Sequence, residues 1–470
     1  MWSLLAIFFL QFTDKLGSSC VCLSPLALEL RAERGIGIDS LDYAVSPLYL
    51  DSLRSLGARV VHTSRWLNGA SVEASSDVLR RIDSCSFVSS ISLTRADGVY
   101  SQCSKDASLV LSGIDVLGSN GQINQLHLSA LHELGYMGEG IRIGVADGGF
   151  YNADKLSFLP KDQCLGYSDF TDDVDDFFGV TGTHGTLCLS AIVGKVICDS
   201  SLFSSLCYVG TAPLAEYYLF RTEEHRSESP KEIDNWVSAI EMADSLGLHI
   251  VSTSLGYTRF DDSSYDYVYS DMDGVSSRGA LASLIAARKG LLLVTAMGND
   301  GDKAWHYLST PADADSILSV GAVDISGNIA SFSSYGPSWD GRVKPEVCAL
   351  GKGTVLLNPV DGSMLSGNGT SFACPLIAGM AACLWSALPG ASNMEIRDRI
   401  VRSSDRYADP DAHYGYGIPN AWLAYTLSPS SYLEPIYGAS SAEKIVKDGH
   451  IYIYIVNEGQ KYDLLGNKIR

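Results

Sequence analysis

Between residues 118 and 428 the sequence alternates short apolar segments with helical ones. The apolar segments are nearly continuous, which is typical of strands buried on both faces. Strands that alternate with helices build a parallel sheet covered on both sides. The sequence therefore predicts an α/β domain with a doubly wound, mostly parallel sheet. Its strands are expected at 141–146, 215–220, 249–253, 291–296 and 317–323, and its helices at 184–196, 230–246 and 279–289.

A smaller domain is predicted at residues 13–100. Leucines recur at helical spacing in 47–59, and a Ser-Ser-Asp sequence can cap a second helix at 75–85. Together with strands on either side of these helices, the order is β-α-β-β-α-β, that of ferredoxin-like α+β domains. The strands are expected before Asp14 and at 60–63, 70–74 and 87–93.

The segment W-S-L-L-A-I-F-F-L-Q-F at 2–12 has two interpretations. It is too short to span a bilayer and suits the core of a secretory signal peptide, although no Lys or Arg precedes it and no A-x-A site follows. The alternative is a first β-strand, since 8–12 is rich in aromatic residues and runs into a turn. The signal-peptide interpretation predicts a secreted or cell-surface protein without a transmembrane span.

Two further segments complete the expected domain organisation. Residues 101–117 form a connector, because the sequence around them is rich in Ser, Gly and Asp and has no sustained periodicity. Residues 429–470 form a β-rich C-terminal tail with a strand at 451–456 and an apparent hairpin at the end.

Composition narrows the possible partners. The formal net charge is −20 and no basic run interrupts the chain, so a nucleic-acid partner is not expected. The 11 cysteines have no zinc-site spacing, so no metal ligands are assigned, and Cys374 and Cys383 lie in an apolar helical stretch as core thiols.

Three polar residues stand at informative places in the predicted α/β domain. Asp147 ends the first strand, where doubly wound sheets bind ligands, while His184 and Ser371 each begin an apolar helix. Each residue also has a simpler interpretation when it is considered alone. Asp147 could be a turn or cap residue, and His184 and Ser371 could be helix caps. Their conjunction, with Gly182, Gly185 and Gly369 leaving room for a peptide backbone, favours a catalytic site.

The chemistry of acyl transfer needs these residue types. A serine hydroxyl becomes a good nucleophile when a neighbouring base accepts its proton, and imidazole titrates near neutrality. A buried carboxylate fixes the imidazole tautomer and stabilises the imidazolium. Asn299 follows the strand at 291–296 and is a candidate oxyanion donor, with a turn residue as the alternative.

These segments resemble the motifs of the subtilisin-like (subtilase) serine peptidases. The matching sequences are D-G-G at Asp147, H-G-T at His184, S-L-G at 254–256, A-M-G-N at 296–299 and G-T-S-F-A-C-P at 369–375. The Asp, His, Ser order is the known order of that family. The resemblance spans about 118–428, and Gly148 departs from the Ser or Thr that usually follows the aspartate.

The resemblance implies further roles. Ser254, Leu255 and Gly256 would form one edge of the substrate cleft, and Ala296, Met297 and Gly298 the opposite wall of the pocket, with a core methionine as the alternative for Met297. The domain at 13–100 would be a prodomain that assists folding and is cut off within 97–121. Segments 12–15 and 65–68 resemble leader regions of subtilases from Bacteroidetes-type bacteria. The tail resembles a sorting or attachment segment of exported proteins, or is a plain hairpin.

The expected function is therefore a serine endopeptidase that acts on peptide or protein substrates through an acyl-enzyme. No cofactor is required. Calcium is possible, since subtilases often bind it and acids cluster at 169–176, but no ligands are assigned and solvated acids are the commoner explanation. A non-catalytic peptide-binding relative is the alternative. An α/β-hydrolase esterase is disfavoured because the chain has no G-x-S-x-G sequence.

Overall fold

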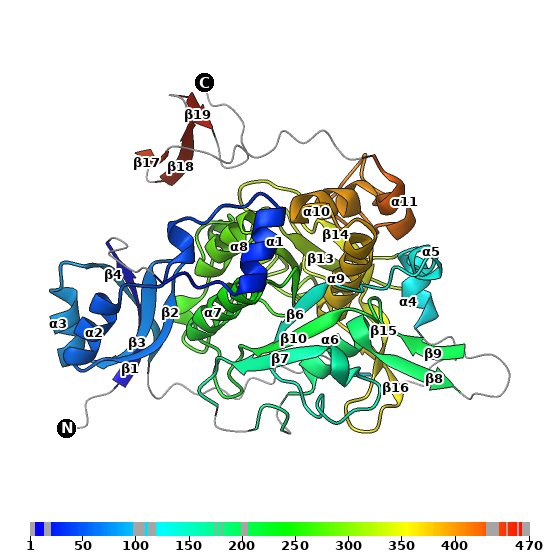
Figure 1. Cartoon of the computed structure of the whole chain (residues 1–470), viewed down its shortest axis with the longest axis horizontal. Helices are drawn as coiled ribbons and strands as arrows, with labels where there is room; N and C mark the ends of the chain where they lie inside the picture. The colour runs from blue at the N-terminus through cyan, green and yellow to red at the C-terminus, as the bar shows by residue number, and fades with distance from the viewer. Residues whose placement is uncertain are drawn as a thin grey trace. The chain divides into compact units, whose positions relative to one another are not determined.

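The computed structural model describes residues 5–13, 20–96, 109–110, 119–173, 176–179, 182–198, 205–428, 441–447, 450–457 and 460–462. The chain forms two compact units, Met1–Thr426 and Leu427–Arg470. The first unit contains an N-terminal α+β domain and the larger α/β domain (Figure 1). Most of the predicted connector lies outside the described residues. Its described part, β5 (Leu109–Val110), pairs with β16 (Met364–Asn368).

The N-terminal domain has the predicted β-α-β-β-α-β order. Its four antiparallel strands lie in the order β2-β3-β1-β4, and α2 and α3 pack on one face around Leu10, Leu53 and Ile82. The elements are β1 (Leu5–Phe12), α2 (Pro47–Ser55), β2 (Arg59–Ser64), β3 (Gly69–Ser75), α3 (Ser76–Asp83) and β4 (Val88–Ala96).

The signal-peptide interpretation of 2–12 is wrong for the described residues 5–12, which form the central strand β1 of this sheet. Leu10 and Phe12 face the core of the N-terminal domain. Phe9 points the other way, and the Arg278 guanidinium of the α/β domain lies 4.9 Å from its ring centroid. The strand is mostly apolar because buried side chains lie on both of its faces, and Gln11 is its one polar and exposed residue. The domain therefore begins before the expected boundary at residue 13.

An excursion between β1 and α2 was not predicted. It contains α1 (Pro25–Glu33) and the short 3-10 helix η1 (Ser40–Asp42), and a bridge between Val21 and Tyr43 closes its base. Ser24 caps α1 by accepting a hydrogen bond from the backbone of Ala27, and Pro25 occupies the first turn, where a missing N–H costs nothing.

The α/β domain is built on a parallel sheet of seven strands in the order β14-β13-β12-β11-β6-β10-β7. The five predicted strands are present, and β7 and β14 add an edge on each side. The strands are β6 (Arg142–Asp147), β7 (Cys164–Asp169), β10 (Glu216–Arg221), β11 (Ile250–Thr253), β12 (Leu292–Ala296), β13 (Leu318–Val323) and β14 (Val347–Leu350).

Helices cover both faces of this sheet (Figure 1). One apolar cluster joins the sheet to α6 (His184–Val193), α9 (Thr370–Ala387) and α10 (Asn393–Arg402). The other joins it to α7 (Lys231–Leu246) and α8 (Arg278–Arg288). The helix expected at 184–196 ends earlier, at Val193, because β8 (Lys195–Cys198) begins there and pairs with β9 (Ser205–Val209).

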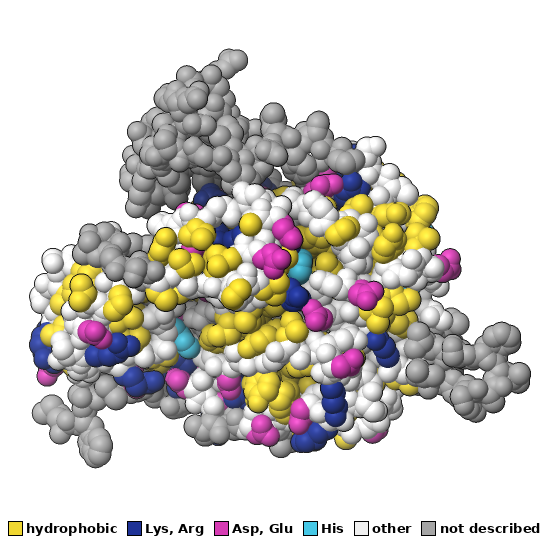
Figure 2. Space-filling view, viewed as in Figure 1, with side chains coloured by type: hydrophobic (Ala, Val, Ile, Leu, Met, Phe, Trp, Pro, Cys, Tyr) yellow, Lys and Arg dark blue, Asp and Glu magenta, His cyan; other side chains and the backbone are white. Residues whose placement is uncertain are grey.

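Among helices of the described residues, α9 alone has the length and composition to cross a membrane, with a mean hydropathy of 1.4. Because 89% of it is buried within the domain, it is a core helix here. Cys374 and Cys383 are fully buried on it, as predicted for core thiols. On the face shown in Figure 2, the Lys and Arg side chains of the described residues are scattered among acidic and apolar ones.

The second unit is described by its backbone alone. Strands β17 (Ser441–Lys447), β18 (His450–Asn457) and β19 (Gln460–Tyr462) form an antiparallel sheet, and the strand expected at 451–456 lies within β18. The last eight residues of the predicted terminal hairpin, 463–470, lie outside the described part.

The packing of α9 leads to a stability prediction. A Cβ at Gly379 would overlap the side chain of Thr211, so Gly379→Ala should destabilise the domain by about 1–3 kcal/mol. The measurement is the thermal unfolding midpoint in a Ser371→Ala background, which prevents self-digestion. Gly390→Ala is the matched control, because nothing lies within 4 Å of that position. Equal midpoints for the two variants would contradict this packing.

Candidate active site

The strand register brings the predicted site residues to one edge of the sheet. Parallel pairing sets Ala146 beside Thr253, and Thr253 beside Thr295. The residues that follow, Asp147, Ser254 and Ala296, therefore leave three adjacent strands at the same carboxyl edge, which is where doubly wound sheets bind ligands.

Asp147 and His184 are joined directly. Nδ1 of His184 lies 2.9 Å from Oδ1 and 3.0 Å from Oδ2 of Asp147. The aspartate side chain is 2% exposed and that of the histidine 21%. Since the carboxylate accepts, Nδ1 carries the proton and Nε2 is left as the basic nitrogen. The backbone N–H of Gly148 also donates to Oδ1 at 2.8 Å, so the unusual residue after the aspartate supplies a donor from its main chain.

Glycine at 185 permits this pairing. A Cβ there would lie 2.9 Å from the Cβ of Asp147 and 2.5 Å from the carbonyl oxygen of Gly149. Any larger residue at position 185 would push the start of α6, and His184 with it, away from β6.

Asp147 also controls the protonation of His184. Burial alone would lower the pKa of the imidazole, but the charge of Asp147 and its hydrogen bond outweigh burial and raise this pKa well above the ordinary 6.5. Cys188 lies one turn along α6, with Sγ 3.9 Å from His184 Nδ1. Burial raises the pKa of this thiol, so it is neutral near pH 7.

Ser371 lies in the first turn of α9 and forms two hydrogen bonds with Ser254. Its Oγ donates to the carbonyl oxygen of Ser254 at 3.2 Å, and Ser254 Oγ donates to the carbonyl oxygen of Ser371 at 2.8 Å. Among the described residues, no hydrogen bond joins Ser371 to His184. The two are neighbours nonetheless: the ring of Phe372 lies 5.5 Å from the His184 ring, and Cys188 Sγ lies 3.4 Å from the Ser371 carbonyl oxygen.

Asn299 is oriented by Thr370. Its Oδ1 accepts from the backbone N–H of Thr370 at 2.9 Å and from the Thr370 hydroxyl at 3.1 Å. Because a backbone N–H must face the oxygen, Nδ2 lies on the other side of the carboxamide. Gly369 leaves the space beside this amide open, since a Cβ there would lie 3.8 Å from both Oδ1 and Nδ2.

The two segments predicted as cleft walls lie at the ends of neighbouring strands, 254–256 after β11 and 296–298 at the end of β12. Tyr257, which follows Ser254, Leu255 and Gly256, exchanges backbone hydrogen bonds with Thr310. Ala296 ends β12, and Gly298 has the positive φ of 108° that favours glycine.

Met297 is the exception among the predicted wall residues. Its side chain is fully buried among Met272, Leu308 and Ala312. The core alternative therefore holds for this side chain.

Two other features bear on the sequence analysis. Cys188 was not among the candidate residues, although its position four residues after His184 places both on one face of a helix. In the acidic segment, Asp169 pairs with Arg221, and Asp172 with Lys231 at 3.0 Å. Both of these carboxylates are thus engaged by basic side chains; residues 174 and 175 lie outside the described part, and calcium stays a prediction.

Comparison with known proteins agrees with this arrangement. The model of the subtilase family (peptidase S8) matches residues 138–417, more than half of the chain. The chain belongs to the subtilase family. Residues 8–107 match the peptidase S8 propeptide domain of Bacteroidota, so the N-terminal domain is a propeptide domain, and the chain is a subtilisin-like serine endopeptidase.

Relatives support the same assignment. The chain is 29% identical over 302 residues to a thermostable alkaline protease of Halalkalibacterium halodurans, covering 64% of this subtilase and 72% of the relative. It is 26% identical over 307 residues to subtilisin of Bacillus pumilus, covering 64% and 97%. The crystal structure of MycP1 from Mycobacterium smegmatis shares the fold, with a TM-score of 0.55 and 19% identity over 70% of this chain and 90% of that one.

The raised pKa of His184 predicts the pH dependence of the subtilase. The general base must be neutral, so kcat/KM should rise with pH with a midpoint above 6.5 and fall away below it. In Ser371→Ala protein the same titration can be followed by NMR of the imidazole. Adding Asp147→Asn should lower the pKa of His184 there. An unchanged pKa would contradict the control that we assign to Asp147.

Proposed function

We propose that the protein hydrolyses peptide bonds through Asp147, His184 and Ser371, with Asn299 as an oxyanion donor. The hydrogen-bonded Asp147–His184 pair supports this most, because it fixes a basic Nε2 at the sheet edge where Ser371 begins α9. The proposal also requires the Ser371 hydroxyl, which donates to Ser254 here, to donate to His184 Nε2 in the reacting complex. Catalytic hydrogen bonds are often formed only when substrate binds.

In the proposed reaction, Ser371 Oγ attacks the carbonyl carbon of the peptide bond while its proton passes to His184 Nε2. Asp147 stabilises the imidazolium. The C–N bond then breaks as His184 returns the proton to the leaving amine, which leaves an acyl ester on Ser371. Water, deprotonated by the same imidazole, cleaves this ester and restores the serine.

The negative charge of the tetrahedral intermediate needs donors. Asn299 Nδ2 is proposed as one, because Thr370 holds the other end of the amide. The backbone N–H of Ser371, in the first turn of α9, is proposed as the second, assisted by the positive end of the helix dipole.

The proposed substrate is an extended peptide or protein segment that adds as a strand along 254–256. Recognition of this kind depends mainly on backbone hydrogen bonds, with side-chain pockets adding preference. A fully buried Met297 side chain leaves the opposite wall to the backbone of Ala296 and Gly298.

Substitution of the proposed residues separates this proposal from a non-catalytic peptide-binding role. Ser371→Ala should lower kcat by about four to six orders of magnitude and abolish labelling by a fluorophosphonate probe. Asn299→Ala should lower kcat by about 100- to 1,000-fold with little change in KM, because its donor acts mainly in the transition state. Cys383→Ala, a buried thiol on the same helix α9, serves as a control. Absence of labelling in the folded wild-type protein would favour the non-catalytic role.

We further propose that the protein acts outside the cell, secreted or at the cell surface, and that the propeptide domain is removed by self-cleavage within 97–121. Mass spectrometry of the medium and surface fractions should find wild type beginning in that range and Ser371→Ala uncut. Equal processing of the two purified proteins in isolation would defeat self-cleavage without bearing on the triad.

A further inference from the structure

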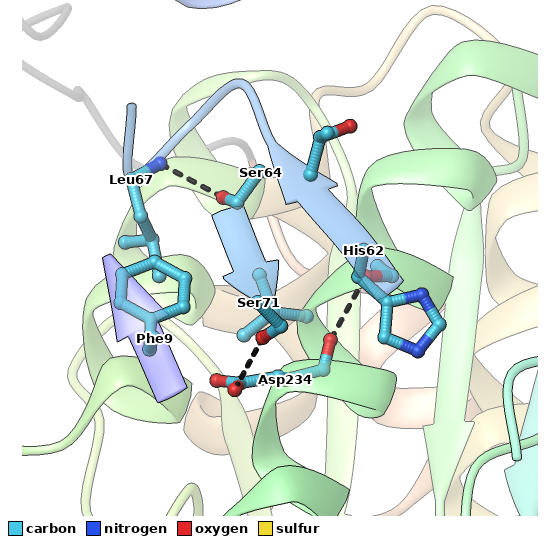
Figure 3. A pocket seen from close by; sticks show the side chains of 9 residues that line it. Phe9, His62, Ser64, Leu67, Ser71 and Asp234 are labelled. Carbon is cyan, nitrogen blue, oxygen red and sulfur yellow. Dashed lines mark hydrogen bonds between the residues drawn. The ribbon is translucent and has the colours of Figure 1, made fainter. Parts of the chain in front are cut away.

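One pocket between the propeptide domain and the catalytic domain has its charge matched within the protein. Figure 3 shows Ser71 of β3 pointing to Asp234 of α7, with Oγ 2.7 Å from Oδ2, and Phe9 and Leu67 lining the same small pocket. Asp234 also accepts from the Arg278 guanidinium at 2.7 Å. This pocket therefore offers no unmatched charge to a ligand.

A larger cavity, here called the α1 cavity, lies between α1 and the catalytic domain. Ile141 and His249, which line it, precede the neighbouring strands β6 and β11, so the cavity lies at the edge of the sheet opposite to the candidate active site. The turn between α9 and α10 forms another wall. Its volume of about 640 Å³ is within the range of about 300–1,000 Å³ that small-molecule sites have.

Arg34, which follows α1 and lines this cavity, forms no ion pair among the described residues. Its guanidinium carbon lies 4.9 Å from the centroid of the Trp385 ring, and Nη1 donates to the Gly290 carbonyl at 3.0 Å. Burial lowers the pKa of Arg34 to about 10, so the group stays charged near pH 7. Arg142, in contrast, pairs with Glu216 at 3.1 Å. A fixed, partly buried guanidinium without a counter-ion suits an anion that binds through two oxygens.

His249 adds an uncharged donor to the α1 cavity. Its Nδ1 accepts from the backbone N–H of Arg142 at 3.3 Å, so Nε2 carries the proton. Burial and the charges of Arg34 and Arg142 lower the pKa of His249 to about 3, which keeps the ring neutral. The ring lies edge-on to Trp385 at 5.4 Å, and Nε2 has no hydrogen-bond partner among the described residues.

Two acids lie at the open side of the α1 cavity. Glu33 and Glu139 line it and are exposed. A carboxylate would balance the single charge of Arg34, and its two oxygens match the guanidinium fork. A phosphate dianion would bring excess negative charge close to the two glutamates. A positive group on the same ligand would instead be attracted to them.

We infer that the α1 cavity binds the free carboxyl end of an amino acid or short peptide. The carboxylate lies against Arg34 and His249, and a positively charged group of the ligand lies toward Glu33 and Glu139. Because Arg34 belongs to the propeptide domain and His249 to the catalytic domain, the site is complete only in the full chain. The inference goes beyond the proposed function and does not depend on it, since no residue of the proposed triad lines the α1 cavity.

The test uses full-length Ser371→Ala protein, which keeps both walls of the cavity together. Isothermal titration calorimetry would compare the dipeptide glycyl-lysine with its C-terminal amide and with inorganic phosphate. The dipeptide should bind at least about 10-fold more tightly than the amide, which lacks the charged carboxylate, and phosphate should not displace it. The inference is refuted if the acid and the amide bind equally, if phosphate displaces the dipeptide, or if the dipeptide does not bind at up to about 10 mM.

Two variants place the binding site in the α1 cavity. Arg34→Gln and His249→Asn should each weaken dipeptide binding by at least about 10-fold, with circular dichroism showing that both are folded. Arg54→Gln is the matched control, because this exposed arginine of the same domain pairs with Asp51 on α2, and it should leave binding unchanged. Wild-type affinity in both cavity variants would show that the dipeptide binds elsewhere and would overturn the assignment.

Discussion

The hydrogen bond between Asp147 and His184 depends on how closely α6 approaches the end of β6. Gly185 allows the approach, and the parallel register then brings the ends of β11 and β12 to the same edge. From these ends the chain delivers Ser254 and Asn299, and α9 begins beside them with Ser371. A shift of α6 by the width of one methyl group would separate the base from its carboxylate. Backbone packing therefore sets the geometry of the site, and the side chains supply its chemistry.

The interface with the propeptide domain follows a different principle. The catalytic residues need a few well-placed polar groups at a partly open edge. The interface instead buries whole charges, with Asp244 shared by two arginines from separate parts of the partner domain. Such an arrangement contributes little net stability compared with an apolar interface, yet it rejects partners whose charges do not match. It suits recognition of one particular domain.

Much of this architecture could be predicted from the sequence. The near-continuous apolar segments located five of the seven strands, and the strand-end rule placed Asp147 at the ligand-binding edge of the sheet. Other features depend on tertiary contacts that a sequence does not display. Residues 5–12 resembled a signal peptide because β1 is buried on both faces, and the direction of the Met297 side chain depends on a cluster that includes Met272 and Leu308. The hydroxyl of Ser371 rests on Ser254, which no spacing rule encodes. The excursion that carries α1 was missed because one of its charged side chains, Arg31, has a partner about 200 positions away, Asp244.

The double burial of β1 has a consequence for the propeptide domain once it is on its own. Ile7, Phe9 and Trp66, now covered, would face water together with Arg65, which would lose its partner Asp244. A freed domain of this kind is prone to self-association and is a ready target for proteolysis. Release of the propeptide domain from the catalytic domain would then be effectively irreversible. Each chain could use its propeptide domain only once.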